Sequence, residues 1–158
     1  MFKPCIVIPV YNHGKLLENN LSELLSFNIP LILVNDGSNQ ETREILTKIS
    51  TENKEIILHN LPKNQGKGAA LEEAFFSAFQ NGFSHALQID ADGQHQISDI
   101  PKFITLAKNN PEALINGTPL YDESSPKSRV YGRKITNFWV ALETISLNIS
   151  DAMCGFRT

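Results

Sequence analysis

The chain has 158 residues, 41% of them hydrophobic and 20% charged, with a formal net charge of -3. This balance is typical of globular proteins and excludes a disordered chain, and the length predicts a single domain over residues 1–158. A negative net charge gives no overall basic field for nucleic acid. We therefore expect no nucleic-acid partner, and expect any phosphate binding to be local.

The two cysteines, Cys5 and Cys154, fit the spacing of neither a zinc site nor a disulfide framework, which indicates reduced thiols. The apolar run near the N-terminus is too short for a signal peptide. No apolar stretch approaches the roughly 20 residues that span a bilayer. We therefore expect a cytoplasmic protein, and we expect any contact with a membrane to be peripheral and at its inner face.

Apolar runs and helical patterns alternate along the chain. Runs typical of buried strands cover residues 5–10, 31–35, 55–60, 85–90 and 113–118. Apolar residues at helical spacing follow at 16–27, 39–50, 69–81 and 97–110, and a long, partly amphipathic stretch covers 130–150. Asn39 or Ser38 is expected to cap the second helix, and Ser98 the fourth. The alternation predicts an α/β fold, with a mostly parallel central sheet and helices on both faces.

Polar residues stand at the ends of the first four predicted strands: Asn12, Asp36, Asn64 and Asp90 lie at or just beyond them. In open parallel sheets the carboxyl ends of the strands form one edge, and ligands bind at that edge. The sequence therefore places its candidate functional residues together before any family is considered.

The stretch from Asp90 to Gln94 follows the fourth predicted strand. Gly93 allows an unusual backbone turn, so Asp90, Asp92 and Gln94 can be aimed at one point. Two carboxylates and an amide oxygen suit Mg²⁺ or Mn²⁺, which keeps water ligands and takes others from phosphate. Aspartates that merely form a turn are the competing interpretation. An EF-hand loop is excluded because the glycine falls at the fourth place.

Two further loops suit a nucleotide. Asp36, held in an Asp-Gly turn, can accept hydrogen bonds from a base or a ribose, although this stretch taken alone favours an ordinary Asx turn. Lys67 lies between Gly66 and Gly68 just before a helix, which leaves backbone N–H groups and a cation for a diphosphate, with a plain turn as the alternative. The loop lacks the Walker A pattern, and no Gly-x-Gly-x-x-Gly turn follows the first strand, which argues against a nicotinamide-binding domain.

Basic residues gather in the last third of the chain. Arg129 and Arg133 are four residues apart on a predicted helix, so they share a face that suits a phosphate, with a solvated basic face as the alternative. Arg157 lies near the C-terminal end. His95 stands next to the acidic stretch and is a further candidate site residue.

Taken in order, the motifs IVIPVYN, LVNDGS, NQGKGAAL, QIDADGQH and DAMCGFR resemble those of family 2 glycosyltransferases, within the dolichyl-phosphate mannosyltransferase-like group of polyprenyl-phosphate sugar synthases. The resemblance covers essentially the whole chain. It implies the GT-A nucleotide-diphospho-sugar transferase fold and inverting transfer of a sugar from a UDP- or GDP-sugar. It also implies a nucleotide-sugar site built from Pro9, Tyr11, Asn12, Asp36, Gly66, Lys67, Asp90, Ala91 and Asp92.

The same resemblance implies roles for the metal and the acceptor. Asp92 and Gln94 would ligate Mg²⁺ or Mn²⁺, with Asp90 beside them as a catalytic residue. The acceptor would be a lipid-linked, polyprenyl-phosphate-like group, a glycan or another hydroxyl, and Arg133 and Arg157 would position its phosphate. A hydroxyl acceptor needs a base, for which Asp151 is the candidate, whereas a phosphate acceptor is already anionic. A homodimer fits this assignment.

The chain departs from the family pattern in four places. His13 replaces the common acidic residue after Tyr-Asn, Asn35 replaces the first aspartate of Asp-Asp-Gly-Ser, and residues 117–119 replace Gly-Ser-Arg. The sequence also ends just past Cys-Gly-Phe-Arg, which predicts a C-terminally short domain.

Two rival functions stay open: a nucleotide-sugar-binding module without turnover and a GT-A-like nucleotidyltransferase. A haloacid-dehalogenase-like phosphatase is disfavoured because its Asp-x-Asp motif follows the first strand, whereas three strand-helix units precede Asp90 here.

Overall fold

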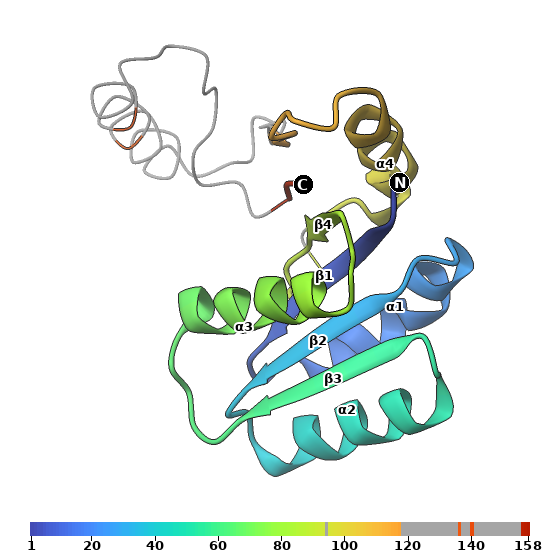
Figure 1. The fold of residues 1–158 in the computed structure, drawn as a ribbon. Helices are drawn as coiled ribbons and strands as arrows, with labels where there is room; N and C mark the ends of the chain where they lie inside the picture. Colours follow the sequence, from blue (N-terminus) through green and yellow to red (C-terminus); the bar gives the residue numbers. More distant parts are fainter. Residues whose placement is uncertain (94, 118–135, 137–139, 141–155) are drawn as a thin grey trace, which may run out of the picture.

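The structure, a computed structural model, describes residues 1–93, 95–117, 136, 140 and 156–158. Its centre is a four-stranded sheet with the order β3-β2-β1-β4, in which every neighbouring pair is parallel (Figure 1). The strands are β1 (Pro4–Val10), β2 (Leu31–Asp36), β3 (Ile56–Leu61) and β4 (His85–Gln88). The first four predicted strands are therefore confirmed to within two residues, as is the parallel sheet.

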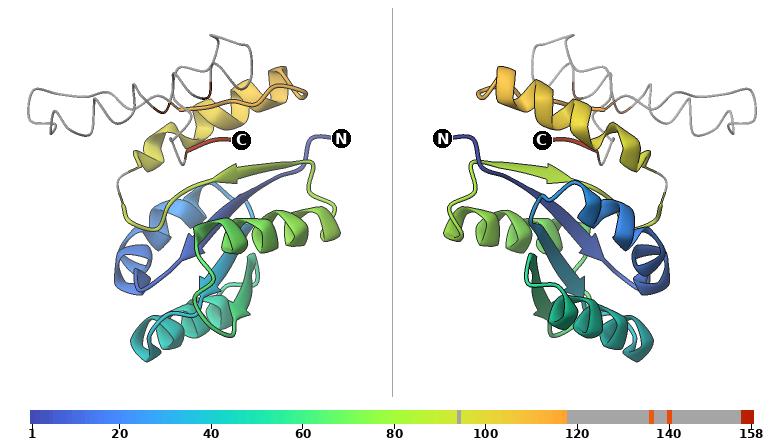
Figure 2. Two further views of the ribbon diagram at one scale, coloured as in Figure 1. Left: turned by 90° about the vertical axis from the view of Figure 1, so that its left-hand side faces the viewer. Right: turned by 90° about the vertical axis from the view of Figure 1, so that its right-hand side faces the viewer.

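Helices cover both faces of this sheet, as predicted. The chain forms α1 (Gly14–Ser26), α2 (Gln40–Glu52), α3 (Lys67–Gln80), the short 3-10 helix η1 (Ile97–Asp99) and α4 (Ile100–Asn109). Figure 2 shows α3 on one side of the sheet and α1 on the other. The two faces form two separate hydrophobic clusters, one with α1, α2 and α4, the other with α3 alone.

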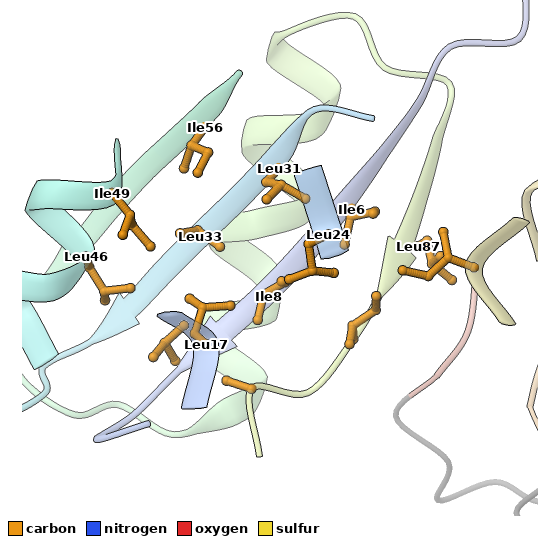
Figure 3. Close-up of a cluster of buried hydrophobic side chains, with 14 of the residues drawn as sticks. Ile6, Ile8, Leu17, Leu24, Leu31, Leu33, Leu46, Ile49, Ile56 and Leu87 are labelled. Atoms are coloured by element: carbon orange, nitrogen blue, oxygen red, sulfur yellow. The ribbon is translucent and has the colours of Figure 1, made fainter. Parts of the chain in front are cut away.

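The larger cluster is built from aliphatic side chains that alternate along the strands, since every second residue of a strand points to the same face. Ile6, Ile8, Leu31, Leu33 and Leu87 of the sheet meet side chains of α1 and α2 in this cluster (Figure 3). All five are at most 1% exposed. This packing gives the strand ends a rigid base.

The fifth predicted strand, 113–118, is wrong over the described residues 113–117, which form no regular strand. In its place Asn116 makes an isolated antiparallel bridge with Arg157, and Arg157 also bridges Gln88. The backbone N–H of Gln88 donates to the carbonyl of Arg157 (2.7 Å). The segment 156–158 thus lies between β4 and residues 115–117. The predicted helix 130–150 lies outside the described residues, except for Thr136 and Val140, which are helical.

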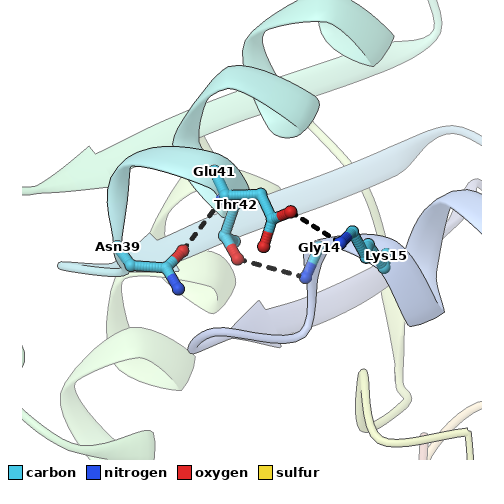
Figure 4. A network of polar contacts seen from close by, with 5 residues as sticks. All are labelled: Gly14, Lys15, Asn39, Glu41 and Thr42. Atoms are coloured by element: carbon cyan, nitrogen blue, oxygen red, sulfur yellow. Dashed lines mark hydrogen bonds and ion pairs between the residues drawn. The ribbon is translucent and has the colours of Figure 1, made fainter.

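The starts of α1 and α2 are tied together by polar contacts (Figure 4). Asn39 caps α2 as predicted: its side chain accepts a hydrogen bond from the backbone N–H of Thr42 (2.9 Å). The Thr42 hydroxyl in turn accepts a bond from the N–H of Gly14, at 3.4 Å. Lys15 lies 2.6 Å from Glu41. The predicted Ser98 cap is wrong, because α4 begins after Asp99 with Pro101 in its first turn.

The sheet order places a switch point between β1 and β4. From β1 the chain moves outward through β2 to β3, and then returns to the other side of β1 to form β4. At such a point the loops after the two neighbouring strands turn to opposite sides and leave a crevice at the carboxyl ends. Among the helices that the structure describes, none is long and apolar enough to cross a membrane.

The fold generates a first prediction, on Cys5. This side chain is fully buried under α3, and burial raises the pKa of its thiol to about 12. In a Cys154→Ser variant, where Cys5 is the sole thiol, we expect almost no reaction with Ellman's reagent at pH 8 while the protein is folded. Denaturation in guanidinium chloride should release the full reactivity and serves as the control. Rapid labelling of the folded protein would contradict the burial.

Candidate functional site

A cavity of about 280 Å³ opens at the carboxyl ends of the strands, at the switch point between β1 and β4. We call it the strand-end cavity. It is lined by the loops after β1, β2, β3 and β4 and by the first turn of α3, through Pro9, Val10, Tyr11, His13, Asp36, Asn64, Gly66, Lys67, Ala70, Asp90, Ala91 and Asp92. Eight of the nine residues predicted for the nucleotide-sugar site therefore meet around one space.

Asn12 is the exception, since it does not line the strand-end cavity. Its backbone has a positive φ of 58°. Its N–H donates to the Ser38 hydroxyl (3.1 Å), and its side-chain oxygen accepts from the N–H of Asn39 (2.8 Å). Asn12 thus fastens the loop after β1, which lines the cavity, to the start of α2.

Asp36 holds the loop that precedes α3. Its two carboxylate oxygens accept hydrogen bonds from the backbone N–H groups of Gln65 (2.7 Å) and Gly66 (2.9 Å). The residue is only 3% exposed. A carboxylate has about four acceptor positions, so a base or ribose at Asp36 would use what these two bonds leave.

Gly37 is required beside Asp36 because the loop after β3 passes very close. Its φ is +62°, and a Cβ at this position would lie 2.2 Å from the backbone carbonyl carbon of Lys63. Asn35, which stands where the family has an aspartate, accepts the N–H of Ser38 (3.0 Å) and donates to Asn60 (2.8 Å). These contacts make the turn after β2 a rigid support for residues 63–66.

The charged centre of the strand-end cavity is a contact between Lys67 and Asp90. The Lys67 ammonium lies 2.6 Å from Oδ1 of Asp90 and donates a hydrogen bond to Oδ2 (2.7 Å). His95 approaches the same carboxylate on its other side, with Nε2 3.4 Å from Oδ2. Asp90 therefore sits between two basic side chains.

This arrangement decides the charge of Asp90. Burial by itself raises the pKa of the carboxyl group, but the interactions with His95 and Lys67 outweigh it and lower that pKa from 3.8 to about 2. Asp90 is consequently ionised at neutral pH. The carboxylate is engaged by the Lys67 ammonium, which itself remains half-exposed toward the cavity.

The metal ligands predicted from the sequence are only partly described, because Gln94 lies outside the described residues. Asp92 lines the strand-end cavity and is half-buried. Within the described part of the chain, no three His, Cys, Asp or Glu side chains form a metal-binding group. One or two carboxylates at an open cavity fit a hard divalent ion that takes most ligands from a diphosphate and water. The residues present thus fit Mg²⁺ or Mn²⁺ bound together with a nucleotide.

His95, a candidate site residue from its position in the sequence, contacts Asp90 on one side and Phe156 on the other. Its ring lies against Phe156, with centroids 5.2 Å apart, and Phe156 stacks on Phe103 of α4 at 4.2 Å. A small cavity of about 20 Å³, large enough for about one water molecule, lies beside His95, Asp90 and Asn20. His95 therefore links the acidic loop to the C-terminal segment.

None of the predicted acceptor residues is among those that line the strand-end cavity in the described part of the chain. Arg157 is described. Its backbone bridges Gln88 of β4 and Asn116, and it does not line the strand-end cavity. Arg133 and Asp151 lie outside the described residues. The sequence prediction also left Val10, His13 and Ala70 unassigned as lining residues. Ala70 has a usable signal, because it lies three residues, close to one helical turn, after Lys67.

Comparison with known proteins adds the family context. The family model described as Glycosyl transferase family 2 matches residues 5–156. The chain is 31% identical over 175 residues to the dolichyl-phosphate beta-glucosyltransferase ALG5D of Trichomonas vaginalis, which covers 96% of this chain and 51% of that protein. It is 27% identical to the UDP-N-acetylglucosamine--dolichyl-phosphate N-acetylglucosaminyltransferase of Methanococcus voltae, over 96% of this chain and 67% of that protein.

A third relative is the undecaprenyl-phosphate 4-deoxy-4-formamido-L-arabinose transferase of Pectobacterium atrosepticum, at 28% identity over 96% of this chain and 47% of that protein. The chain spans about half the length of the first of these relatives. Among solved structures, S. aureus TarS 1-349 superposes with a TM-score of 0.56 at 17% identity, over 77% of this chain and 39% of that chain. This superposition bears on the fold alone, and it agrees with the predicted GT-A fold.

The close approach at Gly37 generates a prediction with a matched control. Gly37→Ala combines a positive φ with a backbone clash, so we expect a loss of about 2 kcal/mol or more in the free energy of unfolding. Gly68→Ala introduces a Cβ with nothing within 4 Å, inside a helix. It should leave stability unchanged or raise it by up to about 1 kcal/mol. Urea unfolding measures both, and equal effects would contradict the close approach.

Asp90 generates a prediction on acid stability. Because its pKa is lower in the folded protein than the ordinary 3.8, its ionised form stabilises the fold above about pH 4, and this contribution is lost as the pH falls toward 2. Asp90→Asn lacks the contribution. In EDTA, urea unfolding between pH 5 and pH 2 should show the wild-type advantage over Asp90→Asn shrinking with falling pH. A difference that stays constant over this range would contradict the contact with Lys67 and His95.

Proposed function

The chain belongs to glycosyl transferase family 2, as its motifs predicted, and on that premise we propose that it transfers a sugar from a nucleoside diphosphate sugar to an acceptor with inversion at the anomeric carbon. One observation carries the proposal: a single cavity gathers a helix N-terminus, a lysine, three aspartates and a tyrosine. These groups suit the two parts of such a donor, its diphosphate and its base and ribose.

The diphosphate would bind where α3 begins. Backbone N–H groups at a helix N-terminus carry partial positive charge and favour phosphate oxygens. Lys67 is the first residue of α3, and its side chain is 51% exposed despite its contact with Asp90. A diphosphate that enters the cavity would share the Lys67 ammonium with Asp90. The contact with Asp90 keeps this ammonium directed toward the cavity.

The nucleoside would lie between the loops after β1 and β2. Tyr11 is 47% exposed at the edge of the strand-end cavity, so its ring is available to stack on a base. Pro9 and Asp36 line the same space. We propose a UDP- or GDP-sugar as the donor, with the remaining acceptor capacity of Asp36 turned to the base or ribose.

Departure of the nucleoside diphosphate requires neutralisation of its growing negative charge. A Mg²⁺ or Mn²⁺ ion held by Asp92 and Gln94 would supply Lewis-acid stabilisation of that charge. Asp90 is engaged by Lys67 and His95, so we assign it to orienting Lys67. Asp92 is accordingly the more direct protein ligand.

The acceptor is proposed from the relatives. Three of them are named for dolichyl- or undecaprenyl-phosphate acceptors. For this chain we propose a lipid-linked phosphate, with a hydroxyl acceptor as the second choice. Arg157 and Arg133 would position the phosphate, and Asp151 would serve as the base for a hydroxyl. Such an acceptor requires a protein at the surface of a membrane, and we propose the inner face, in contact with the cytoplasm.

The test is calorimetric titration of UDP, GDP and their common sugar conjugates into the chain, with Mn²⁺ and then with EDTA. We expect one nucleotide to bind in a metal-dependent manner, and Asp92→Ala to weaken that binding at least tenfold. The fold should stay intact, because a half-buried carboxylate at a strand end adds little to the core. Asp99→Ala removes a carboxylate outside the cavity lining and should bind as the wild type does.

Nucleotide binding that is indifferent to EDTA, or equal in Asp92→Ala and the wild type, would contradict the metal role. Sugar transfer to a polyprenyl phosphate, followed by chromatography of the product, then separates an enzyme from a binding module. Tight donor binding without transfer or hydrolysis would favour the binding module.

A further inference from the structure

Helix α3 is built with its small residues inside and its large ones outside. Ala70, Ala74 and Ala78 are at most 4% exposed and pack on the sheet. Phe75 and Phe76 are 42% and 55% exposed, and Phe79 is 80% exposed. A helix of a globular protein normally turns its largest apolar side chains toward the core. Here the order is reversed, so the core does not account for the three phenylalanines.

These three side chains form one continuous patch, which we call the aromatic face. At about 100° per residue, Phe75, Phe79 and Phe76 fall within a single sector of about 100° on the helix surface. This sector is opposite the alanine side, and it belongs to the C-terminal half of α3. The patch therefore points away from the sheet and presents three aromatic rings together.

The exposed area of the aromatic face distinguishes between possible occupants. With about 200 Å² for each Phe side chain, the exposed fractions amount to about 350 Å². A specific interface between two proteins buries about 800 Å² on each partner, so this face alone is too small to hold a stable dimer. A lipid surface makes no such demand, because each aromatic side chain inserts by itself into the boundary between headgroups and acyl chains.

We propose that the aromatic face of α3 docks the protein on a lipid bilayer through insertion of Phe75, Phe76 and Phe79. Glu72 shares this outer side of the helix and Glu73 lies at its flank, and the chain is net negative. Insertion is therefore driven by apolar contact rather than by attraction to anionic lipid. Zwitterionic vesicles should suffice, and added anionic lipid should not strengthen binding.

The position of the face suits the strand-end cavity. Lys67 opens α3 at the cavity, and Phe76 lies nine residues on, about 14 Å along the helix axis. A helix lying flat on the bilayer would hold the cavity within reach of the headgroups. This last step rests on the proposed function, in which the acceptor is a lipid-linked phosphate; the docking surface itself does not.

The test is co-sedimentation of the 158-residue chain with phosphatidylcholine vesicles. We expect the wild type to bind, and the triple variant Phe75→Ser, Phe76→Ser, Phe79→Ser to lose at least tenfold in binding. Leu114→Ser is the matched control, because Leu114 is a 71% exposed apolar residue outside α3. It should bind as the wild type does. Thermal unfolding by circular dichroism should show that the outward substitutions leave the fold intact.

A second readout places the insertion. In a Trp139→Phe background, which removes the one tryptophan, Phe79→Trp should shift its emission to the blue when vesicles are added. Leu114→Trp in the same background should not. Absence of vesicle binding by the wild type, equal binding by the triple variant, or no shift for Phe79→Trp would each overturn the proposal.

Two further measurements separate this proposal from others. Light scattering after size exclusion, in buffer without lipid, should show the same mass for the wild type and the triple variant. A dimer of the wild type that is absent in the triple variant would overturn lipid docking and would assign the aromatic face to a second copy of the chain. Calorimetry of the triple variant should show donor binding equal to that of the wild type. Vesicle binding without nucleotide binding would leave the docking surface standing while the proposed function fails.

Discussion

The strand-end cavity depends on the two hydrogen bonds by which the Asp36 carboxylate holds the N–H groups of Gln65 and Gly66. These bonds, together with the close approach at Gly37, fix the loop that leads into α3. Since α3 starts at Lys67, the loop also fixes where the lysine side chain can reach. The contact between Lys67 and Asp90 is the outcome, and it joins the loop after β3 to the end of β4. The Asp36 carboxylate at the end of β2 thus helps to position the contact between Lys67 and Asp90, which lies beside β4, two strands away in the sheet.

The two neighbouring aspartates have different surroundings, although only one residue separates them. Asp90 lies between Lys67 and His95 and its charge is balanced by the protein. Asp92 lines the open cavity, where in the proposed function a divalent metal ion would bind its carboxylate. This difference turns an Asp-x-Asp sequence into two functional parts. In the proposed function, the first orients Lys67 and the second would bind the metal ion that accompanies the donor.

The sequence predicted what depends on local patterns. Strands β1 to β4, the helices between them and the Asn39 cap follow from apolar spacing and from residues at most three apart. The pairing of Arg157 with Gln88 and Asn116 was not predictable, because it joins segments about 40 or more residues apart without a local signal. The same limit applies at the site. Asp36, Lys67 and Asp90 were each assigned to the nucleotide, whereas the structure shows Asp36 bonded to the loop before α3 and Lys67 bonded to Asp90, over sequence separations of 23 to 30 residues.

Helix α3 shows how one element can serve three surroundings. Val7, Ile32 and Val34 already fill the space above the sheet with branched side chains, so the helix packs there through alanines that allow a close approach. Its first turn is committed to the strand-end cavity through Lys67 and Ala70. Only the outer side is left without a packing requirement, and a sequence under no further constraint would place polar residues on it. The phenylalanines at that side therefore require a cause outside the core and outside the cavity, and contact with a lipid surface supplies one.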